Sequence, residues 1–476
     1  MDSILGFLTD LKNHLWGGPL LALLILVGIW LTIRLKGMQF RYLPHALSLL
    51  FKSGGPSGGR NKGKGSGGGD LSSFESLMTA LAGAVGTGNI TGIAVAMTIG
   101  GYGSLFWMWL IALFGMVTAY AECLLAVKFR SKSPDGGILG GPMETLKKGL
   151  GMHKTAKLFA FFCILASFGI GGTVQSNSVA AGMSEVFQID HWVTGFVMMI
   201  LTAAVVLGGV KSIGKAAGIL VPTMAVLYLG AGLIVICAHI DQVIPALKLI
   251  VTSALTGQAA FGGFLGAGVL SAIQQGVSNG IFANEAGLGS LSIAASSAQT
   301  DEPARQGMLA ICGVFIATML VCTMTGLVIA VTQVLGQQAA DGSLITGSAL
   351  TINAFNRFHS GFGYVVVFGM VFFAFTTVLA WAYYGEKSVE FLAGSKVAKG
   401  YRLIYSASVF LGVMIEPELV WVLANLANGC MAFPNLIAIF RLTDVVVEET
   451  NCYLRNLSEK ASDAKDQAME RVRSPL

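Results

Sequence analysis

Long apolar segments are the feature that most constrains how this chain folds. Residues 14–34 contain a single charge, Arg34, at the very end of the segment. A helix needs about 20 apolar residues to cross the roughly 30 Å hydrocarbon core of a bilayer. A cleaved signal peptide would have a shorter apolar core and a small-residue cleavage site, and no such site follows. The segment therefore predicts a transmembrane helix.

The same pattern recurs along the whole chain. Of the 476 residues, 54% are hydrophobic and only 12% are charged, and the mean hydropathy is +0.71. A soluble protein of this size has about twice that charged fraction. We therefore expect an all-α integral membrane protein with about eleven transmembrane helices. The predicted spans are 14–34, 75–99, 104–130, 157–186, 191–209, 217–239, 262–299, 304–335, 362–390, 401–415 and 418–440.

The spans after the first fall into two groups of five. Between the first span and these groups, the sequence KSGGPSGGRNKGKGSGGGD is too rich in glycine, serine and basic residues to pack as a core. The predicted units are an N-terminal surface segment at 1–13, the first span at 14–34, a cytoplasmic Gly/basic linker at 35–74, a first five-helix repeat at 75–239, an outer connection at 240–261, a second five-helix repeat at 262–440 and a partly helical cytoplasmic tail at 441–476.

The distribution of Lys and Arg predicts the orientation of the chain. With the N-terminus outside and the spans alternating, 27 of the 30 Lys and Arg residues fall on the cytoplasmic side, and Lys12, Lys248 and Arg357 remain outside. Cytoplasmic loops are enriched in basic residues, and a wrong number of spans would scramble this split. We expect a multi-pass protein of the cell membrane, or of the inner membrane in a Gram-negative bacterium, with a cytoplasmic C-terminus.

The second span is interrupted by the sequence GAVGTGNITG at 83–92. A membrane tolerates the backbone groups freed by such a break only where they face protein or a water-filled cavity. Unwinding near Gly86 to Gly88 would offer N–H groups to a carboxylate at the start of a half-helix. The carbonyls near Ala82 to Val85 would suit a cation. Close packing of a neighbouring helix against the glycines is the alternative.

A second interrupted span, at 274–290, reads QQGVSNGIFANEAGLGS. It opens the second group of five spans as the first break opens the first group, and the two spans cross the membrane in opposite directions. Two broken helices at matching positions of inverted halves indicate a transport site near the bilayer midplane. The pair therefore favours a ligand site over helix packing.

Polar residues of two further spans are candidates for the walls of that site. Thr376 and Thr377 are adjacent, and Trp381 lies on the same helical face as Thr377. The hydroxyls can complete an oxygen cage for a small cation, and the indole can bound a small pocket. The alternative is that the hydroxyls bond to their own helix carbonyls. Gln175, in a glycine-rich polar patch, is equally compatible with a ligand contact and with a bridge between helices.

Two carboxylates lie near or inside the membrane, where ionisable residues are functional candidates by default. They are Glu122, six residues before Lys128 and so near the cytoplasmic interface, and Glu285 in the second interrupted span. We expect a structural or gating role for both in preference to direct ligand contact.

Four segments resemble the alanine or glycine:cation symporter family. They are SSFESLMTALAGAVGTGNITGIAVAMTIGGYGSLFWMWLIALFGMVTAYAECLLAVKFR, NGIFANEAGLGS, DEPARQG and FTTVLAWAYYGEK. The resemblance extends from about residue 70 to residue 440. It implies a five-plus-five inverted repeat with discontinuous helices, similar to the sodium-coupled neurotransmitter transporters, preceded by one extra helix.

The resemblance also implies the residues of a substrate site and a sodium site. The implied substrate contacts are Thr87, Gly88 and Asn89 for the carboxylate, together with Ala84, Gln175, Gly276, Thr377 and Trp381. The implied sodium ligands are the hydroxyls of Thr376 and Thr377 and the backbone oxygens of Ala82, Val85 and Phe373. Relatives commonly have a basic residue where this chain has Ser278-Asn279. The family's gating ion pair is therefore not expected, and Asn279 joins Glu122 and Glu285 as a gating candidate.

These features predict a sodium-coupled symporter that imports small neutral amino acids, alanine or glycine, by alternating access. A proton-coupled or broader-range amino-acid transporter is the alternative. A channel would need a repeated filter motif, ATP-driven transport a Walker A motif, and an enzyme a converging set of catalytic groups, and the sequence shows none of these. The expected partners are the amino acid, sodium and membrane lipid, without nucleic acid, and the oligomeric state stays open.

Overall fold

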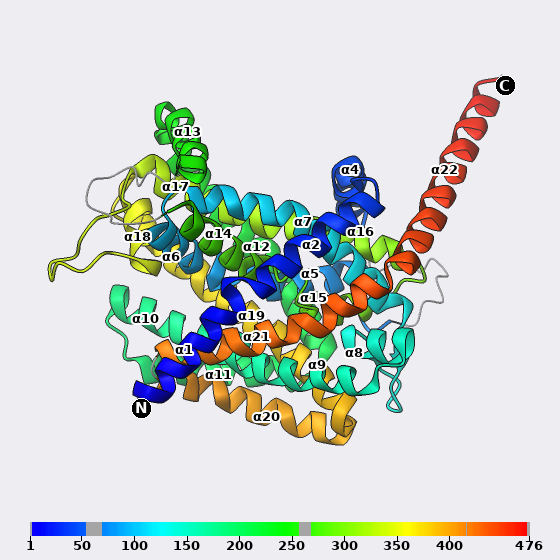
Figure 1. Cartoon of the computed structure of the whole chain (residues 1–476), viewed down its shortest axis with the longest axis horizontal. Helices are drawn as coiled ribbons and strands as arrows, with labels where there is room; N and C mark the ends of the chain where they lie inside the picture. The colour runs from blue at the N-terminus through cyan, green and yellow to red at the C-terminus, as the bar shows by residue number, and fades with distance from the viewer. Residues whose placement is uncertain (1, 54–68, 257–267, 416, 474–476) are drawn as a thin grey trace.

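The computed structural model describes residues 2–53, 69–256, 268–415 and 417–473. Nearly all of this part of the chain is helical, and many of the long helices run side by side in a common direction (Figure 1). The described residues form one small sheet, in which strands β1 (Ser131–Lys132) and β2 (Ile138–Leu139) pair antiparallel.

The helices divide into two halves along the chain. In the first half they are α1 (Asp2–Gly17), α2 (Pro19–Arg34), α3 (Met38–Arg41), α4 (Leu43–Ser53), α5 (Ser73–Ala84), η2 (Thr87–Asn89), α6 (Thr91–Gly100), α7 (Gly103–Lys128), α8 (Pro142–Glu144), η3 (Thr145–Gly149), α9 (His153–Ala166), η4 (Ser167–Thr173), α10 (Val174–Phe187), α11 (His191–Val206), α12 (Val210–Ala238) and α13 (Ile240–Thr256). In the second half they are α14 (Val269–Asn284), α15 (Ser290–Ser296), α16 (Pro303–Val314), η5 (Phe315–Cys322), α17 (Thr323–Thr332), α18 (Gly347–Asn356), α19 (Phe362–Ala393), α20 (Ser395–Gly412), α21 (Pro417–Arg441) and α22 (Thr443–Arg473).

Seven helices of the described chain are long and apolar enough to cross a membrane: Leu5–Arg34, Gly103–Lys128, His153–Phe187, Val210–Ala238, Pro303–Thr332, Phe362–Ala393 and Leu419–Arg441. The other four predicted spans are broken, short or more polar. The pairs α5 with α6 and α14 with α15 are each interrupted, α11 has 16 residues, and α20 contains Lys396, Lys399 and Arg402. The count of eleven spans stays a prediction.

Two regions predicted to be surface segment or linker contain helix. Helix α1 begins at Asp2, within the predicted segment 1–13. Helices α3 and α4 occupy part of the predicted linker 35–74, because the leucines of α4 recur at helical spacing and this helix packs on α16. The rest of that linker, at 54–68, lies outside the described residues.

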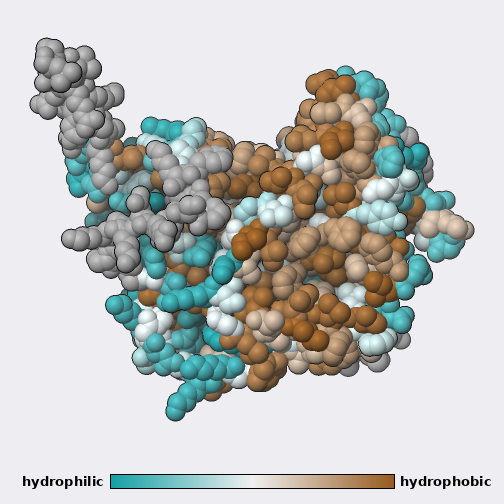
Figure 2. Space-filling view, turned by 180° about the vertical axis from the view of Figure 1, so that it is seen from behind, coloured by the Kyte–Doolittle hydropathy of each residue, from teal (hydrophilic) through white to brown (hydrophobic). Residues whose placement is uncertain are grey.

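The surface of the long helices is apolar where lipid would surround them. On α12, the exposed side chains Ile219, Val226 and Leu233 recur every seven residues and are 60%, 72% and 53% exposed. Figure 2 shows a broad apolar face over the body of the molecule, with hydrophilic side chains concentrated toward its ends. An apolar face of this extent is expected of a protein embedded in a bilayer.

The first predicted helix break is present. Helix α5 begins at Ser73, where Ser72 and Glu75 form a capping box, and ends at Ala84. Gly86 is extended, with φ −123° and ψ −160°, and a short 3-10 turn at Thr87–Asn89 precedes α6. Residues 81–90, which contain the break, are all buried. The freed backbone groups therefore face protein, as the membrane environment requires.

The second break is present near the C-terminal end of the predicted segment 274–290, after the glycines of QQGVSNG. Helix α14 continues through this sequence to Asn284, and the chain turns at Glu285, whose φ is +55°, before α15. Gly287 and Gly289 also have positive φ values, of 85° and 90°, which glycine adopts without strain. The interruption is therefore at 285–289, within the sequence EAGLG.

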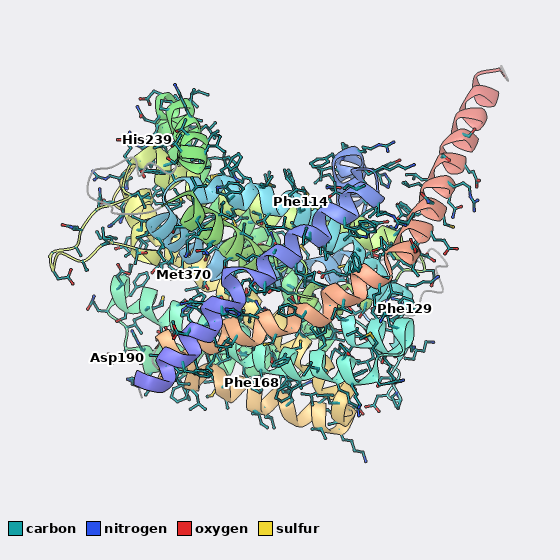
Figure 3. All side chains as sticks on the ribbon, viewed as in Figure 1. Phe114, Phe129, Phe168, Asp190, His239 and Met370 are labelled. Carbon is teal, nitrogen blue, oxygen red and sulfur yellow. The ribbon has the colours of Figure 1, made fainter. Side chains whose placement is uncertain are left out.

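Glycines allow two helices to approach α7 closely. A Cβ at Gly28 of α2 would lie 2.6 Å from the Cβ of Phe114, at the crossing of α2 and α7 (Figure 3). A Cβ at Gly276 of α14 would lie 2.4 Å from the carbonyl oxygen of Ser104 in α7. Gly276 thus serves close packing of α14 on α7, which was the alternative to a ligand site. It lies in this helix interface and not beside the first break.

Segments η4 and η5 are π-helical turns within longer helices. Each follows an α-helix without interruption, α9 and α16 respectively, and leads into the next, α10 and α17. A π-helical turn shifts the hydrogen-bonding pattern from i→i−4 to i→i−5, and such turns often lie at functional sites. Both segments contribute backbone oxygens to the contacts described below.

Candidate transport site

Asn89 joins the two broken helices. Its Nδ2 donates to the carbonyl oxygens of Ala283, at the end of α14, and of Ala317, in η5, each at 3.1 Å. Its Oδ1 accepts a hydrogen bond of 2.9 Å from the backbone N–H of Gly86. The side chain is fully buried. Asn89 therefore holds the first break in place through contacts within the protein.

Thr377 of α19 points into the same break. Its Oγ1 lies 2.9 Å from the carbonyl oxygens of Ala82 and Phe373, and 3.4 Å from that of Val85. Three carbonyl oxygens, from α5, α19 and the break, thus surround the Thr377 hydroxyl, which makes a cluster of four oxygen atoms. Oxygen ligands of this kind are the ones that small hard cations prefer. The structure brings together these four of the five predicted sodium ligands.

Thr376, the fifth, faces in a different direction. Its Oγ1 donates to the carbonyl oxygens of Phe372 and Phe373, both at 3.0 Å, and lies 3.6 Å from the sulfur of Met224 in α12. This is the bonding to its own helix that was the alternative for the threonine pair, and Thr377 shares it through its contact with the Phe373 carbonyl. Thr376 touches the oxygen cluster only through the shared carbonyl of Phe373.

Gln175 connects α10 to the first break. Its Oε1 accepts from the backbone N–H of Thr87 at 3.2 Å and from the Thr87 hydroxyl at 3.0 Å. Its Nε2 donates at 3.1 Å to the carbonyl of Ile170, five residues earlier in η4. Gln175 is therefore a bridge between helices, and it also lines the cavity described next.

A small cavity lies between the two breaks and α19. Its volume is about 10 Å³, which is room for about one water. It must widen to accept an amino acid. Its lining residues are Gly83, Ala84, Gly86, Gly88, Asn89, Ile170, Gln175, Phe282, Glu285 and Thr377.

Glu285 brings a carboxylate to this cavity. Its side chain is 2% exposed. Its Oε1 accepts from Trp381 Nε1 at 2.8 Å, and its Oε2 accepts from Ser290 Oγ at 2.7 Å. The left-handed backbone of Glu285 at the end of α14 directs the side chain toward α19, where Trp381 lies. The structure thus places a buried carboxylate on the wall of the cavity, beside the predicted substrate contacts.

Trp381 lies behind this carboxylate. Its side chain is fully buried, and a Cβ at Gly171 would lie 2.1 Å from the Cβ of Trp381, so that η4 and α19 are in close contact here. Its ring meets that of Tyr384 edge-on, with centroids 5.4 Å apart. Trp381 is not among the residues lining the cavity. Its direct contact with the site is the hydrogen bond to Glu285.

Glu122 supports the second break from α7. Asn435 of α21 donates both to Glu122 Oε2, at 2.8 Å, and to the carbonyl oxygen of Gly287, at 3.0 Å. Glu122 is 2% exposed, so it lies deeper than its distance from Lys128 suggested. The contact agrees with the structural role considered for this carboxylate, and its gating role stays a prediction.

A larger opening lies on the other side of Phe282. This vestibule has a volume of about 730 Å³ and is lined by α1, α6, α14 and α21, with Asn279 on its wall. Asn279 Nδ2 donates to its own helix at the carbonyl of Gln275. Phe282 lines both the vestibule and the small cavity, and its ring packs against Trp421 with centroids 5.4 Å apart. Phe282 therefore separates the two spaces.

The structure brings most of the predicted site residues together. Ala84, Gly88, Asn89, Gln175, Glu285 and Thr377 line one cavity, with Thr87, Ala82, Val85 and Phe373 in direct contact with this group. Gly276, Asn279 and Glu122 lie elsewhere. Ile170 and Phe282 were not predicted from the sequence, since apolar residues in apolar helices carry no signal that separates a cavity wall from core.

Comparisons with known proteins agree with this architecture. The model of the sodium:alanine symporter family matches residues 1–468. The chain is 45% identical to the sodium/alanine symporter AgcS of Methanococcus maripaludis, over 98% of this chain and 100% of that protein. It is 36% identical to the probable sodium/glutamine symporter GlnT of Bacillus subtilis, over 96% of this chain and 91% of that protein.

Two solved structures share the fold. MhsT in complex with L-phenylalanine has a TM-score of 0.55 at 15% identity, covering 80% of this chain and 92% of that chain. A Na⁺-coupled sialic acid symporter has a TM-score of 0.53 at 13% identity, covering 85% and 86%. The predicted fold class and the family resemblance are thereby confirmed, and the protein is a multi-pass membrane transporter and not an enzyme. The chain belongs to the sodium:alanine symporter family.

Proposed function

We propose that the protein couples the import of alanine and glycine to sodium by alternating access. Sodium-coupled symport of alanine is the activity named for its family. The observation that carries the proposal is that Thr377 belongs to both sites. Its hydroxyl is part of the oxygen cluster, and its side chain lines the cavity. A cation held by this cluster would lie next to the substrate, so that each would favour binding of the other.

The first break supplies the substrate end of the site. A Cβ at Gly86 would lie 2.7 Å from Thr377 Oγ1, and one at Gly88 would lie 2.6 Å from the ring of Phe282. Both glycines thus keep the backbone open on the cavity side. Residues 86–88 lie at the start of a half-helix, where an anion is stabilised, and side-chain oxygens of Asn89 and Gln175 accept from the N–H groups of Gly86 and Thr87 there. We assign the substrate carboxylate to this backbone and sodium to the Thr377 cluster.

The two ends of the molecule are closed by different contacts. On the vestibule side, the ring of Phe282 is the barrier. On the opposite side, Leu71 forms a parallel bridge with Ala298, and Arg130 donates to the carbonyls of Ser296, Ala298 and Thr300. Alternating access requires that these two sets of contacts open in turn.

A sodium gradient is expected to drive alanine accumulation in proteoliposomes. With one sodium ion per alanine, a tenfold inward gradient, worth about 1.4 kcal/mol, should accumulate alanine about tenfold. The measurement is uptake of labelled alanine, with potassium replacing sodium as the control and with unlabelled glycine as competitor. Accumulation driven by a proton gradient without sodium would instead establish the proton-coupled alternative. Failure of glycine to compete would remove it from the substrates.

The orientation can be tested with two exposed lysines. In a variant without its native cysteines, Lys248→Cys on α13 should react with an impermeant thiol reagent added to intact cells. Lys396→Cys on α20 should react only after permeabilisation, because basic residues are concentrated on the cytoplasmic side. Both side chains are exposed in the structure, so a difference in labelling reports the side of the membrane. The reverse pattern would invert the predicted topology.

A further inference from the structure

The carboxylate of Glu285 is buried without a cationic partner. In the described part of the chain, no Lys, Arg or His forms a salt bridge with it. Its hydrogen-bond donors, Trp381 Nε1 and Ser290 Oγ, are both neutral. A buried charge is costly unless it is paired and hydrogen-bonded. Each carboxylate oxygen can accept a further hydrogen bond, and the side chain lines the central cavity.

The cavity has opposite polarity at its two ends. The unwound backbone at Gly86 and Gly88 lines it at the start of a half-helix, the end that favours negative charge, and Glu285 presents negative charge from the second break. A zwitterionic amino acid has the matching arrangement, with a carboxylate and an ammonium group on one carbon atom. The Thr377 oxygen cluster, made of Ala82, Val85 and Phe373 carbonyls, does not include Glu285.

We propose that Glu285 binds the ammonium group of the transported amino acid. The proposal rests on the proposed amino-acid transport and deepens it, because it names the group that distinguishes an amino acid from a hydroxy acid or a simple carboxylate. A hydrogen bond between an ammonium and a carboxylate is charge-assisted and among the strong ones. Trp381 and Ser290 are positioning residues, since each holds one oxygen of the carboxylate.

L-Lactate provides the decisive comparison. It keeps the carboxylate and the methyl group of alanine and has a hydroxyl in place of the ammonium group. Purified protein in detergent with saturating sodium is titrated with labelled alanine, and lactate is measured as a competitor. The wild type should bind alanine far more tightly than lactate. Glu285→Gln should weaken alanine binding by at least about 30-fold, with lactate competition little changed, so that the preference collapses.

Two further variants separate charge from structure. Glu285→Asp keeps the charge and should recover part of the preference for alanine over lactate. Trp381→Phe removes the indole N–H and keeps a ring, so it should weaken alanine binding by less than Glu285→Gln does and leave the preference largely intact. Glu144→Gln is the control, because Glu144 is 1% exposed but lies beside Lys147 and Lys148, away from the cavity. It should bind both compounds as the wild type does.

The outcomes distinguish this proposal from the proposed function. An unchanged alanine-to-lactate preference in Glu285→Gln would overturn the role of Glu285 and leave amino-acid transport standing. Equal weakening of alanine and lactate would also overturn it, because a structural defect or a lost sodium ligand acts on both compounds. If the wild type binds and transports neither alanine nor any other amino acid, the proposed function fails and the proposal falls with it.

Discussion

Gly88→Val is expected to abolish alanine uptake while the protein stays folded in the membrane. A Cβ at this position would lie 2.6 Å from Cδ1 and 2.7 Å from Cε1 of Phe282. Real Cβ atoms do not approach so closely, so the ring must move. Phe282 is packed against Trp421 and separates the cavity from the vestibule. A displaced ring and a branched side chain would together fill the space assigned to the substrate carboxylate.

Uptake by Gly88→Val, Gly88→Ala and Gly92→Ala measured at equal protein in the membrane tests this expectation. Gly92 is the matched control, because it lies four residues later, in the first turn of α6, and a Cβ there would meet nothing closer than Asn279 Oδ1, at 3.4 Å. We expect Gly88→Ala to lose at least about 90% of the rate, equivalent to about 1.4 kcal/mol, and Gly92→Ala to keep most of it. Normal transport by Gly88→Val would show that the break serves helix packing.

Thr377→Val is expected to raise the sodium concentration for half-maximal uptake by at least about tenfold. Valine has nearly the same shape as threonine but lacks the hydroxyl, which lies within 3.4 Å of the carbonyls of Ala82, Val85 and Phe373. Loss of one oxygen ligand costs on the order of 1.4 kcal/mol or more. The measurement is initial uptake rate against sodium concentration at saturating alanine.

Thr376→Val is the matched control for this experiment. The Thr376 hydroxyl bonds to its own helix and faces Met224 of α12, not the break. A smaller shift in sodium dependence is therefore expected than for Thr377→Val. Equal shifts in the two variants would show that both threonines are sodium ligands. An unchanged sodium dependence in Thr377→Val would show that the cluster is not the cation site.

The first break was predictable because its sequence conflicts with its surroundings. Gly86, Gly88 and Asn89 interrupt an otherwise apolar helix, and the structure unwinds there. The second break lies within the predicted segment 274–290, but the sequence does not say which of its glycines unwind the chain, since glycine marks close helix approach as well as unwinding. Gly276 packs on α7, whereas Gly287 and Gly289 turn the chain. Only tertiary contacts separate these two uses of glycine.

The position of Glu285 could not be derived from the sequence for a similar reason. A carboxylate inside an apolar span was a functional candidate for which a structural or gating role was expected, but its distance from Thr377 and Gln175 depends on how the two repeats pack. The same holds for Trp381, which shares a helical face with Thr377 yet meets the site through Glu285. Helical periodicity predicts which residues are neighbours on one helix, whereas a transport site is built from residues of several helices.

The unpaired carboxylate of Glu285 has an electrical consequence for the transport cycle. When ionised, it gives the central site one negative charge. A bound sodium ion cancels that charge, and a zwitterionic amino acid leaves the sum at zero. The membrane potential acts on net charge that moves through the field, by about 2.3 kcal/mol per elementary charge for each 100 mV. An inside-negative potential would then accelerate the outward return of the unloaded carrier, and the loaded carrier would cross without sensing voltage.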